Sequence, residues 1–502
     1  MKAPKNFQFI KKPYQHQWES FVFALKRNNA GILLDLGLGK TKVAIDVARY
    51  RIQHSNVDKV LVVCPTSILV NWKNEIQKFS EYKAVILHAP RQERRRRLFL
   101  PNYHFYIINY ESLFPIFKSI GILKPIGMPP KWKYIDNKPK ISYLISKLNF
   151  KMIIFDESAR YIKNHQAKRT RASILLADHA QYKLILTGTP IANKPLDVWS
   201  QYRVLDGGKT FGTNFYQFRN RYFMRLKMGM WDKWVMKKSS VDIFSSKIYS
   251  VSIRKTKDEI AQDFPKRINQ VIELKPTGEL LKIYKKVYKQ IISEIDTKGG
   301  NVVLEVNNIL TKLLRLQQIT SGFVGTRKRG FYELNTTPKL DALIDEIESV
   351  VDANESVVVW CRFRKSIELI SKRLDKLKVK YITMSGKDSD KYKKWKGFQK
   401  SKTKNVFIGQ VESGGIGIEL FKHESDAKKS QYMIFFENTW SLDTREQALG
   451  RIHRIGQKSL CVYKDLVVKH TIDERILESI KENKKIADLI LEKGVKGWLN
   501  RK

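Results

Sequence analysis

Cysteine is scarce in this chain of 502 residues, and Cys64, Cys361 and Cys461 lie far apart without a CxxC pair. This spacing argues against a zinc site and a disulfide framework, and it is typical of a reducing compartment. Apolar runs of the length that spans a membrane are also lacking. The opening stretch MKAPKNFQFIKKPYQ has no apolar core like that of a secretion signal, so we expect no membrane attachment.

Acidic residues are few, with 49 Asp and Glu against 94 Lys and Arg, which gives a formal net charge of +45. So much charge of one sign opposes compaction, and a polyanionic partner would relieve the repulsion. We therefore expect a nucleic-acid partner, ahead of a membrane surface or a compositional bias alone. An apolar content of 42% and this length suit a globular protein of two or three domains.

The stretch LLDLGLGKTKVAI is an apolar run that two glycines interrupt before helical spacing begins. It predicts a strand over 30–36, a turn and then a helix, which is the context of a phosphate-binding P-loop. Gly37 and Gly39 would turn backbone N–H groups toward phosphates, Lys40 would reach the terminal phosphates, and Thr41 would bind Mg²⁺. The first glycine of the pattern GxxxxGK[ST] is a leucine in this chain.

Two further apolar runs end in polar residues. FKMIIFDES ends in Asp156 and Glu157, where one acid could orient Mg²⁺ and the next could polarise an attacking water. The alternative is an acidic turn in solvent, and the P-loop earlier in the chain favours a nucleotide site. LILTGTP closes on Thr187, Gly188 and Thr189, which could sense a γ-phosphate. Such strands alternating with helices predict a parallel α/β sheet that binds its ligand beyond the carboxyl ends of the strands.

The last third of the chain carries a second group of motifs. QALGRIHRIGQ places Arg451 and Arg454 three residues apart, on one face of a predicted helix. They are either a basic solvent face or arginine fingers that reach a γ-phosphate from a second domain, a role worth roughly 10³–10⁵ in turnover. NVFIGQVESGGIGIEL predicts a strand before a glycine-rich segment, and SVVVWCRF predicts a buried strand that ends at Arg362.

Together these segments resemble a helicase-superfamily-two motor of the SWI/SNF-like branch. KPYQHQ resembles the segment that reads adenine. GLGKT, VLVVCPTSILVNWKNEIQKF, FYIINYESL, DES…IKN and LTGTPIANKPLDVWS match the first lobe, and TPKLDAL, VVVWCRF, ESGGIGIEL and TREQALGRIHRIGQ match the second. The segments follow the family's order through most of the chain, and LTGTP with GRIHRIGQ is rather specific to this branch.

The resemblance implies an α/β fold of two RecA-like parallel-sheet lobes with helical insertions between them, and it implies ATP and Mg²⁺ as cofactors. ATP binding is expected at Gln15, Gly37, Leu38, Gly39, Lys40, Thr41 and Gly417, with Thr41 and Asp156 as metal ligands. Catalytic roles fall to Lys40, Asp156, Glu157, Gln447, Arg451 and Arg454, and coupling to Thr187, Gly188 and Thr189. Nucleic-acid contacts are expected at Thr66, Ser67, Asn109, Arg362 and Ser413.

Two positions depart from the family's pattern. Ala159 stands where the family usually has a histidine after the motif II glutamate, which puts interlobe coupling through that motif in doubt. Glu419 stands where asparagine or threonine is commoner, and an acid there could weaken the grip on nucleic acid.

The motifs also predict the organisation of the chain. We expect a first RecA-like lobe over 1–205, helical protrusions with a brace and an interlobe linker over 206–335, a second lobe over 336–480, and a basic tail over 481–502. Residues 115–148 are interpreted as a looped insertion. FRNRYFMRLKMGMWDKWVMKK is either a nucleic-acid surface or the small core of the protrusion, and we prefer the core.

The resemblance implies a nucleic-acid-stimulated ATPase that moves along double-stranded DNA. We expect it to remodel forks, branched DNA or protein–DNA complexes, as in DNA repair or replication. One alternative is a strand-separating helicase on DNA or RNA, which needs a separating pin. The other is a non-catalytic nucleic-acid-binding scaffold. The expected location is the cytoplasm of a bacterial or virus-infected cell, at the nucleoid, or the nucleus of a eukaryote. Protein partners and oligomeric state are not predicted.

Overall fold

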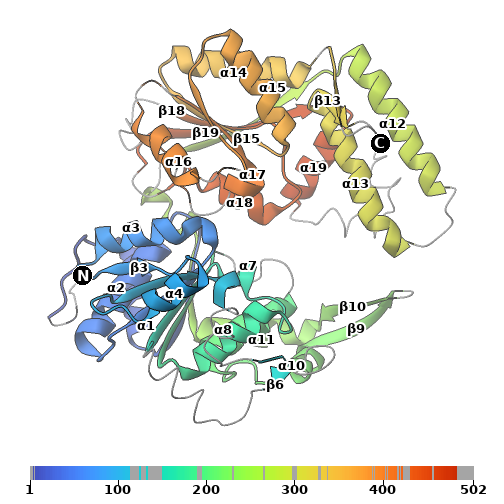
Figure 1. Ribbon diagram of the computed structural model, residues 1–502. Coiled ribbons are helices and arrows are strands. Elements are labelled where there is room, and N and C mark those ends of the chain that lie inside the picture. Colours follow the sequence, from blue (N-terminus) through green and yellow to red (C-terminus); the bar gives the residue numbers. More distant parts are fainter. Residues whose placement is uncertain are drawn as a thin grey trace. The chain divides into compact units, whose positions relative to one another are not determined.

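The structure is a computed structural model, in which the chain forms two compact units, Met1–Ala261 and Gln262–Lys502 (Figure 1). It describes residues 4–482 apart from 5, 114–123, 126–131, 134–149, 189–194, 229–230, 264–265, 297–301, 326–329, 336, 387, 389, 402, 404, 415–417, 419, 422–429 and 455–456. Most of the predicted insertion and nearly all of the predicted tail therefore lie outside the described residues, as do Thr189, Gly417 and Glu419.

The first unit is built on a parallel sheet with the strand order β11-β1-β8-β7-β2-β4-β3 among the described residues. In chain order the strands are β1 (Asn29–Leu34), β2 (Val60–Cys64), β3 (Ala84–Ile86), β4 (Phe105–Asn109), β7 (Met152–Asp156), β8 (Tyr182–Leu186) and β11 (Ser252–Lys255). The central strands are buried along nearly their whole length, which is why their sequences read as continuous apolar runs rather than as alternating ones.

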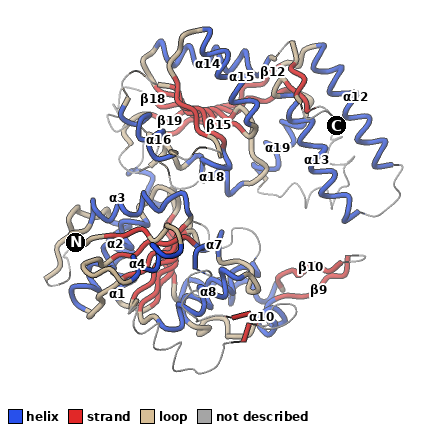
Figure 2. The backbone as a smooth tube through the Cα atoms, viewed as in Figure 1, coloured by secondary structure: helices blue, strands red, loops and turns tan. Residues whose placement is uncertain are grey.

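Helices cover both faces of this sheet (Figure 2). Side chains of α8 and α9 join one face in a single core cluster, whereas α1, α2 and α3 pack on the other face. The described helices of the unit are α1 (Gln15–Leu25), α2 (Lys40–His54), α3 (Leu69–Phe79), α4 (Arg91–Leu98), α7 (Ser158–Tyr161), α8 (Lys168–His179), α9 (Val198–Asp206), α10 (Phe215–Tyr222) and α11 (Val241–Ser250). A short antiparallel pair, β5 (Lys124–Pro125) with β6 (Trp132–Lys133), lies inside the predicted insertion.

The edge strand β11 ties the end of the first unit to β1. Gly31 of β1 pairs with Ser252, and a Cβ at Gly31 would lie 2.2 Å from the Ser252 hydroxyl, so only glycine allows this approach. Beyond the strands, Asp35 N donates to Lys255 O over 3.0 Å, and Lys257 N donates to the Asp35 carboxylate over 3.0 Å. The chain thus leaves the sheet beside the strand that precedes the glycine turn.

A protrusion formed by α10, α11 and an antiparallel hairpin completes the first unit. The hairpin strands are β9 (Phe223–Met228) and β10 (Trp231–Met236). Phe218, Tyr222 and Phe223 are buried in the core cluster of the unit. The preferred interpretation of this segment, a small core of the protrusion itself, is wrong for these three residues, because they join the core of the whole unit. The two strands were not predicted.

The second unit contains another parallel sheet, with the order β12-β19-β18-β15-β17-β16 among the described residues. Its strands are β12 (Arg267–Leu274), β15 (Ser356–Cys361), β16 (Tyr381–Met384), β17 (Val406–Gln410), β18 (Ser430–Phe435) and β19 (Leu460–Val468). Alternate residues of β15 enter opposite cores, Val357 and Val359 on one face and Val358 and Trp360 on the other. Both faces are therefore buried.

Helices α14 and α15 cover one face of the second sheet, and α16 and α18 cover the other. A separate core joins α12, α13 and α19. The described helices are α12 (Gly278–Asp296), α13 (Val302–Thr320), α14 (Pro338–Asp352), α15 (Arg364–Lys376), α16 (Lys391–Lys400), α17 (Val411–Gly414), α18 (Leu442–Leu449) and α19 (Ile472–Lys481), with a hairpin of β13 (Phe323–Gly325) and β14 (Phe331–Glu333).

The predicted α/β fold with two parallel sheets is confirmed. Both the strand before the glycine turn and the helix after it form as the sequence predicts. Among the described helices, none combines the length and the apolar character needed to cross a bilayer. The predicted domain boundaries rest on the motifs and stay predictions.

Candidate functional site

The carboxyl ends of β1, β8 and β7 are neighbours in the first sheet, and the predicted nucleotide motifs follow these three strands. After β1 the chain turns through Gly37 and Gly39, whose φ angles of 91° and 81° lie in the left-handed region that favours glycine. Helix α2 then starts at Lys40, and the buried Lys40 Nζ donates to Leu34 O over 2.6 Å. A left-handed turn before a helix N-terminus presents backbone N–H groups to an anion.

Helix α1 supports this turn through residues that the sequence analysis did not select. Gln17 Nε2 donates to Leu38 O over 3.1 Å, and its Oε1 accepts from Tyr14 N over 3.2 Å. His16 Nε2 lies 2.9 Å from the same Leu38 carbonyl. Gln15, the predicted adenine reader, is exposed and donates to Glu19 over 2.8 Å. Gln17 could have been chosen over Gln15 because it lies on the buried face of α1.

Asp156 ends β7 in a fully enclosed position. Trp72 of α3 donates its indole Nε1–H to Asp156 Oδ2 over 2.8 Å, and Glu157 N donates to Oδ1 over 2.9 Å. Tyr110 donates its hydroxyl to the Asp156 carbonyl over 2.7 Å. Each carboxyl oxygen thus accepts one N–H bond. Neither Trp72 nor Tyr110 was selected from the sequence.

The surroundings of Asp156 include groups that raise its pKa and groups that lower it. Burial and the neighbouring Glu157 raise the pKa of Asp156 from 3.8 to about 7, while the Trp72 bond and the charge of Lys40 lower it. The charge of Lys40 lowers the pKa of this carboxyl because the first turn of α2 and the end of β7 lie near each other, after strands separated only by β8. Perturbed carboxyls in such settings are typical of functional sites.

Glu157, Thr187 and Gly188 complete the strand-end group. Glu157 adopts a left-handed backbone conformation with φ 51°, which directs the chain from β7 into α7. Thr187 follows β8, is buried, and donates its N–H to Ile32 O over 3.3 Å. A Cβ at Gly188 would lie 3.7 Å from Leu34 O, so this glycine approaches the end of β1.

Further along the same edge lie the predicted nucleic-acid contacts of the first unit. Thr66 and Ser67 follow β2 and are exposed. Asn109 ends the neighbouring β4, and its Nδ2 donates to Thr66 Oγ1 and Glu111 Oε2, both over 3.1 Å. The Asn109 Oδ1 atom is buried without a protein partner. The structure thus joins Thr66 and Asn109 in one polar group.

Arg362 of the second unit follows β15, which ends at Cys361 and thus one residue earlier than predicted. Its guanidinium lies 4.5 Å from the centre of the Trp440 ring and 3.9 Å from Glu412 Oε1, with Nη1 buried and unpartnered. Its backbone N–H donates to the buried Glu437 over 2.7 Å, and burial raises the pKa of Glu437. Ser413 lies in α17, the short helix after β17, and only its backbone is described.

The predicted catalytic residues of the second unit follow β18. Gln447 is buried within α18, and Arg451 is buried with Nη1 donating to Ile418 O over 3.0 Å. Arg454 is half-buried. The expectation that Arg451 and Arg454 share a helical face is wrong, because α18 ends at Leu449 and both arginines lie in the turn that follows.

Residues for a hard cation are present at the strand ends. Thr41 provides a hydroxyl in the first turn of α2, and Asp156 provides a carboxylate, which are the oxygen ligands that Mg²⁺ prefers. No three His, Cys, Asp or Glu side chains of the described residues gather as a metal site. The three cysteines are buried thiols, and burial raises the pKa values of Cys64 and Cys361.

Comparison with known proteins gives two family matches. Residues 14–322 match the SNF2-related domain, and residues 338–456 match the helicase conserved C-terminal domain. The chain is also similar to a solved structure titled Sulfolobus solfataricus SWI2/SNF2 ATPase core in complex with dsDNA. The match covers 98% of this chain and 96% of the other, at 23% identity and a TM-score of 0.44.

Curated relatives span nearly all of the chain. An uncharacterized ATP-dependent helicase of Mycoplasma genitalium is 27% identical over 93% of this chain and 41% of its own length. The putative ATP-dependent helicase/translocase YwqA of Bacillus subtilis is 23% identical over 98% of this chain and 50% of its own length. The chain thus spans about half or less of the length of these relatives.

Proposed function

The chain belongs to the family defined by the SNF2-related domain, and from this premise we propose that it is an ATP-dependent translocase on double-stranded DNA. The single observation that carries the proposal is the strand-end group, in which the glycine turn before Lys40 and the buried Asp156 follow β1 and β7 at the same edge of one parallel sheet. The relatives named ATP-dependent helicases, and the chain's net charge of +45, support the same assignment.

The glycine turn suits the phosphates of ATP. Gly37 and Gly39 hold the backbone in the left-handed region, and the N-terminus of α2 adds partial positive charge. Lys40 would exchange its bond to Leu34 O for one to a terminal phosphate oxygen. Gln17, rather than Gln15, contacts the turn directly, so we assign Gln17 to positioning the turn beside the nucleotide.

The two acids take different roles in this proposal. Asp156, fixed by two N–H donors, would hold Mg²⁺ together with Thr41. Bound Mg²⁺ would neutralise charge on the phosphates. Glu157, whose backbone turns out of β7, would orient the attacking water and accept its proton. Thr187 at the adjacent strand end is suited to transmit the state of the γ-phosphate.

The remaining predicted residues fit the same scheme. The polar group of Thr66 and Asn109, with Ser67, would contact the nucleic-acid backbone from the first unit. Arg451 and Arg454 would complete ATP hydrolysis from the second unit. Ala159 replaces the usual histidine and is buried, so it offers no polar link between the lobes. Remodelling of forks, branched DNA or protein–DNA complexes is part of this proposal.

The rate of ATP hydrolysis at fixed low salt tests this proposal. It is measured without nucleic acid and then with duplex DNA, with single-stranded DNA and with RNA, for the unchanged protein and for Glu157→Gln. We expect strong stimulation by duplex DNA that the variant lacks, whereas Glu348→Gln, on α14, keeps it. Displacement of a third strand from a DNA triplex would then report movement along the duplex. Stimulation only by single strands or RNA would favour a strand-separating helicase, and absence of hydrolysis would favour a scaffold.

A further inference from the structure

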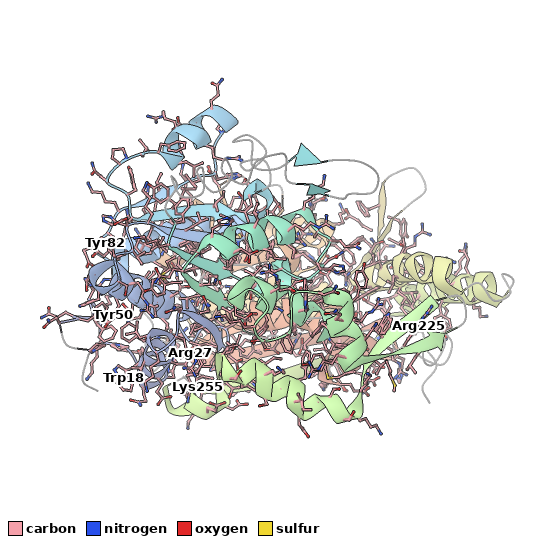
Figure 3. The ribbon with its side chains drawn as sticks, turned by 90° about the horizontal axis from the view of Figure 1, so that it is seen from below. Trp18, Arg27, Tyr50, Tyr82, Arg225 and Lys255 are labelled. Atoms are coloured by element: carbon pink, nitrogen blue, oxygen red, sulfur yellow. The ribbon has the colours of Figure 1, made fainter. Side chains whose placement is uncertain are left out.

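The β9–β10 hairpin extends beyond α10 and α11 of the first unit (Figure 1). Its strands pair antiparallel from Phe223 with Met236 to Met228 with Trp231. Arg225 marks the hairpin in Figure 3, at the opposite end of the unit from Trp18 and Lys255. A two-stranded ribbon has little stability of its own and depends on what its faces contact.

The two faces of the ribbon differ in what covers them. Phe223 is buried in the core of the unit, and its cross-strand partner Met236 packs against that core. Side chains alternate along a strand, so Met224, Leu226 and Val235 lie on the opposite face. Met224 is 44% exposed and Leu226 is 43% exposed. The ribbon thus presents apolar side chains to solvent.

Basic residues are frequent in the hairpin and in the helix before it. The Arg219 guanidinium stacks over the Trp234 ring at 3.9 Å, which holds it at the base of the hairpin. Over residues 215–238, the acidic residue Asp232 is outnumbered by the basic residues Arg219, Arg221, Arg225, Lys227, Lys233, Lys237 and Lys238. This charge complements a polyanion, so a nucleic acid fits this segment better than an ordinary protein surface does.

We propose that the hairpin is a wedge that inserts Met224 and Leu226 against the bases at a duplex end or fork and unstacks the terminal step. Leucine and methionine are among the apolar residues that proteins insert between base steps, and neighbouring cations hold the phosphates. The inference rests on the proposed function for its substrate, double-stranded DNA. It supplies the separating element that the strand-separating alternative requires.

A forked duplex with 2-aminopurine at the junction tests the wedge, because the fluorescence of this base rises when it unstacks. The full chain without ATP is titrated against the fork. We expect a junction signal for the unchanged protein, and about a tenfold higher half-saturating concentration for Leu226→Ser, the effect of losing one leucine-sized apolar contact. Met224→Ser should act in the same direction.

The matched control is Ile243→Ser, because Ile243 is 54% exposed on α11 of the same protrusion but lies off the hairpin. This variant should keep the junction signal. A junction signal that is absent from the unchanged protein, or equal in Leu226→Ser and Ile243→Ser, would overturn the wedge. The wedge would also be overturned if the hairpin bound a protein while Leu226→Ser and Met224→Ser both kept the junction signal.

The experiments distinguish a failure of the wedge from a failure of the proposed translocase function. Because the fork titration contains no ATP, the junction signal does not depend on hydrolysis or movement. Duplex-stimulated hydrolysis by Leu226→Ser at the unchanged rate, together with a lost junction signal, would support both proposals. Loss of duplex stimulation in the unchanged protein with an intact junction signal would refute only the translocase.

Discussion

Trp72→Phe should destabilise the first unit more at pH 8.5 than at pH 5.5. The pKa of Asp156 is raised from 3.8 to about 7, so between these values the folded chain binds a proton that the unfolded chain has released. Ionising Asp156 as the pH rises toward and past 7 therefore lowers the free energy of unfolding. The Trp72 indole, 2.8 Å from Oδ2, offsets part of this loss.

The magnitude follows from the kind of hydrogen bond. A bond to a charged group contributes about 1.5–3 kcal/mol to stability, and a bond between neutral groups about 0.5–1.5 kcal/mol. Losing the indole donor should therefore cost roughly 1 kcal/mol more at pH 8.5, where Asp156 is charged, than at pH 5.5. The cavity left by the smaller ring costs the same at both pH values and cancels in the comparison.

Calorimetry of the full chain in metal-free buffer at both pH values measures the difference, with Asp156→Asn in a double-mutant cycle. Trp360→Phe is the control, because the Trp360 Nε1 atom is buried without a partner and should give the same cost at both pH values. Equal costs of Trp72→Phe at both pH values, or additivity with Asp156→Asn, would show that the indole does not stabilise the charged form of Asp156.

Two further substitutions test other parts of the molecule. Gly39→Ala should weaken binding of a fluorescent ATP analogue, because the new Cβ would lie 2.3 Å from Gln17 Nε2 and displace this amide from its bond to Leu38 O. Gly207→Ala, at a similar φ of +73° with open space around it, should keep binding and lose only about 1–2 kcal/mol of stability. Asp473→Ala should lower the free energy of unfolding by about 3–5 kcal/mol, because it leaves the buried Lys339 ammonium without its carboxylate. The double variant Lys339→Met with Asp473→Leu should recover most of that loss in urea unfolding, and a double variant as unstable as Asp473→Ala alone would contradict this account.

The sequence predicts the strands and the polar residues that end them, because both depend on local pattern. The apolar run before Gly37 and the run before Asp156 form strands as expected. In a parallel sheet all strands end at one edge, so local pattern already brings these residues to the same side of the sheet. The fold and the strand-end group of the first unit were therefore largely predictable.

Contacts between distant segments were not predictable in this way. The bond from Trp72 to Asp156 joins residues far apart in the chain, and no local pattern distinguishes this tryptophan from an ordinary core residue. Gln17 was missed because the choice between two nearby glutamines depends on which face of α1 meets the turn. The helix expected through Arg451 stops at Leu449, because the following Gly450 favours a helix end over continuation.

The connection between β11 and β1 has a mechanical consequence. The chain passes from β11 toward the second unit, so a load carried along the backbone enters the first unit at β11. The first strand that resists this load is β1, through the Gly31–Ser252 pairing and the bond from Lys257 to Asp35. Tension along this connection therefore falls on the strand that precedes the glycine turn.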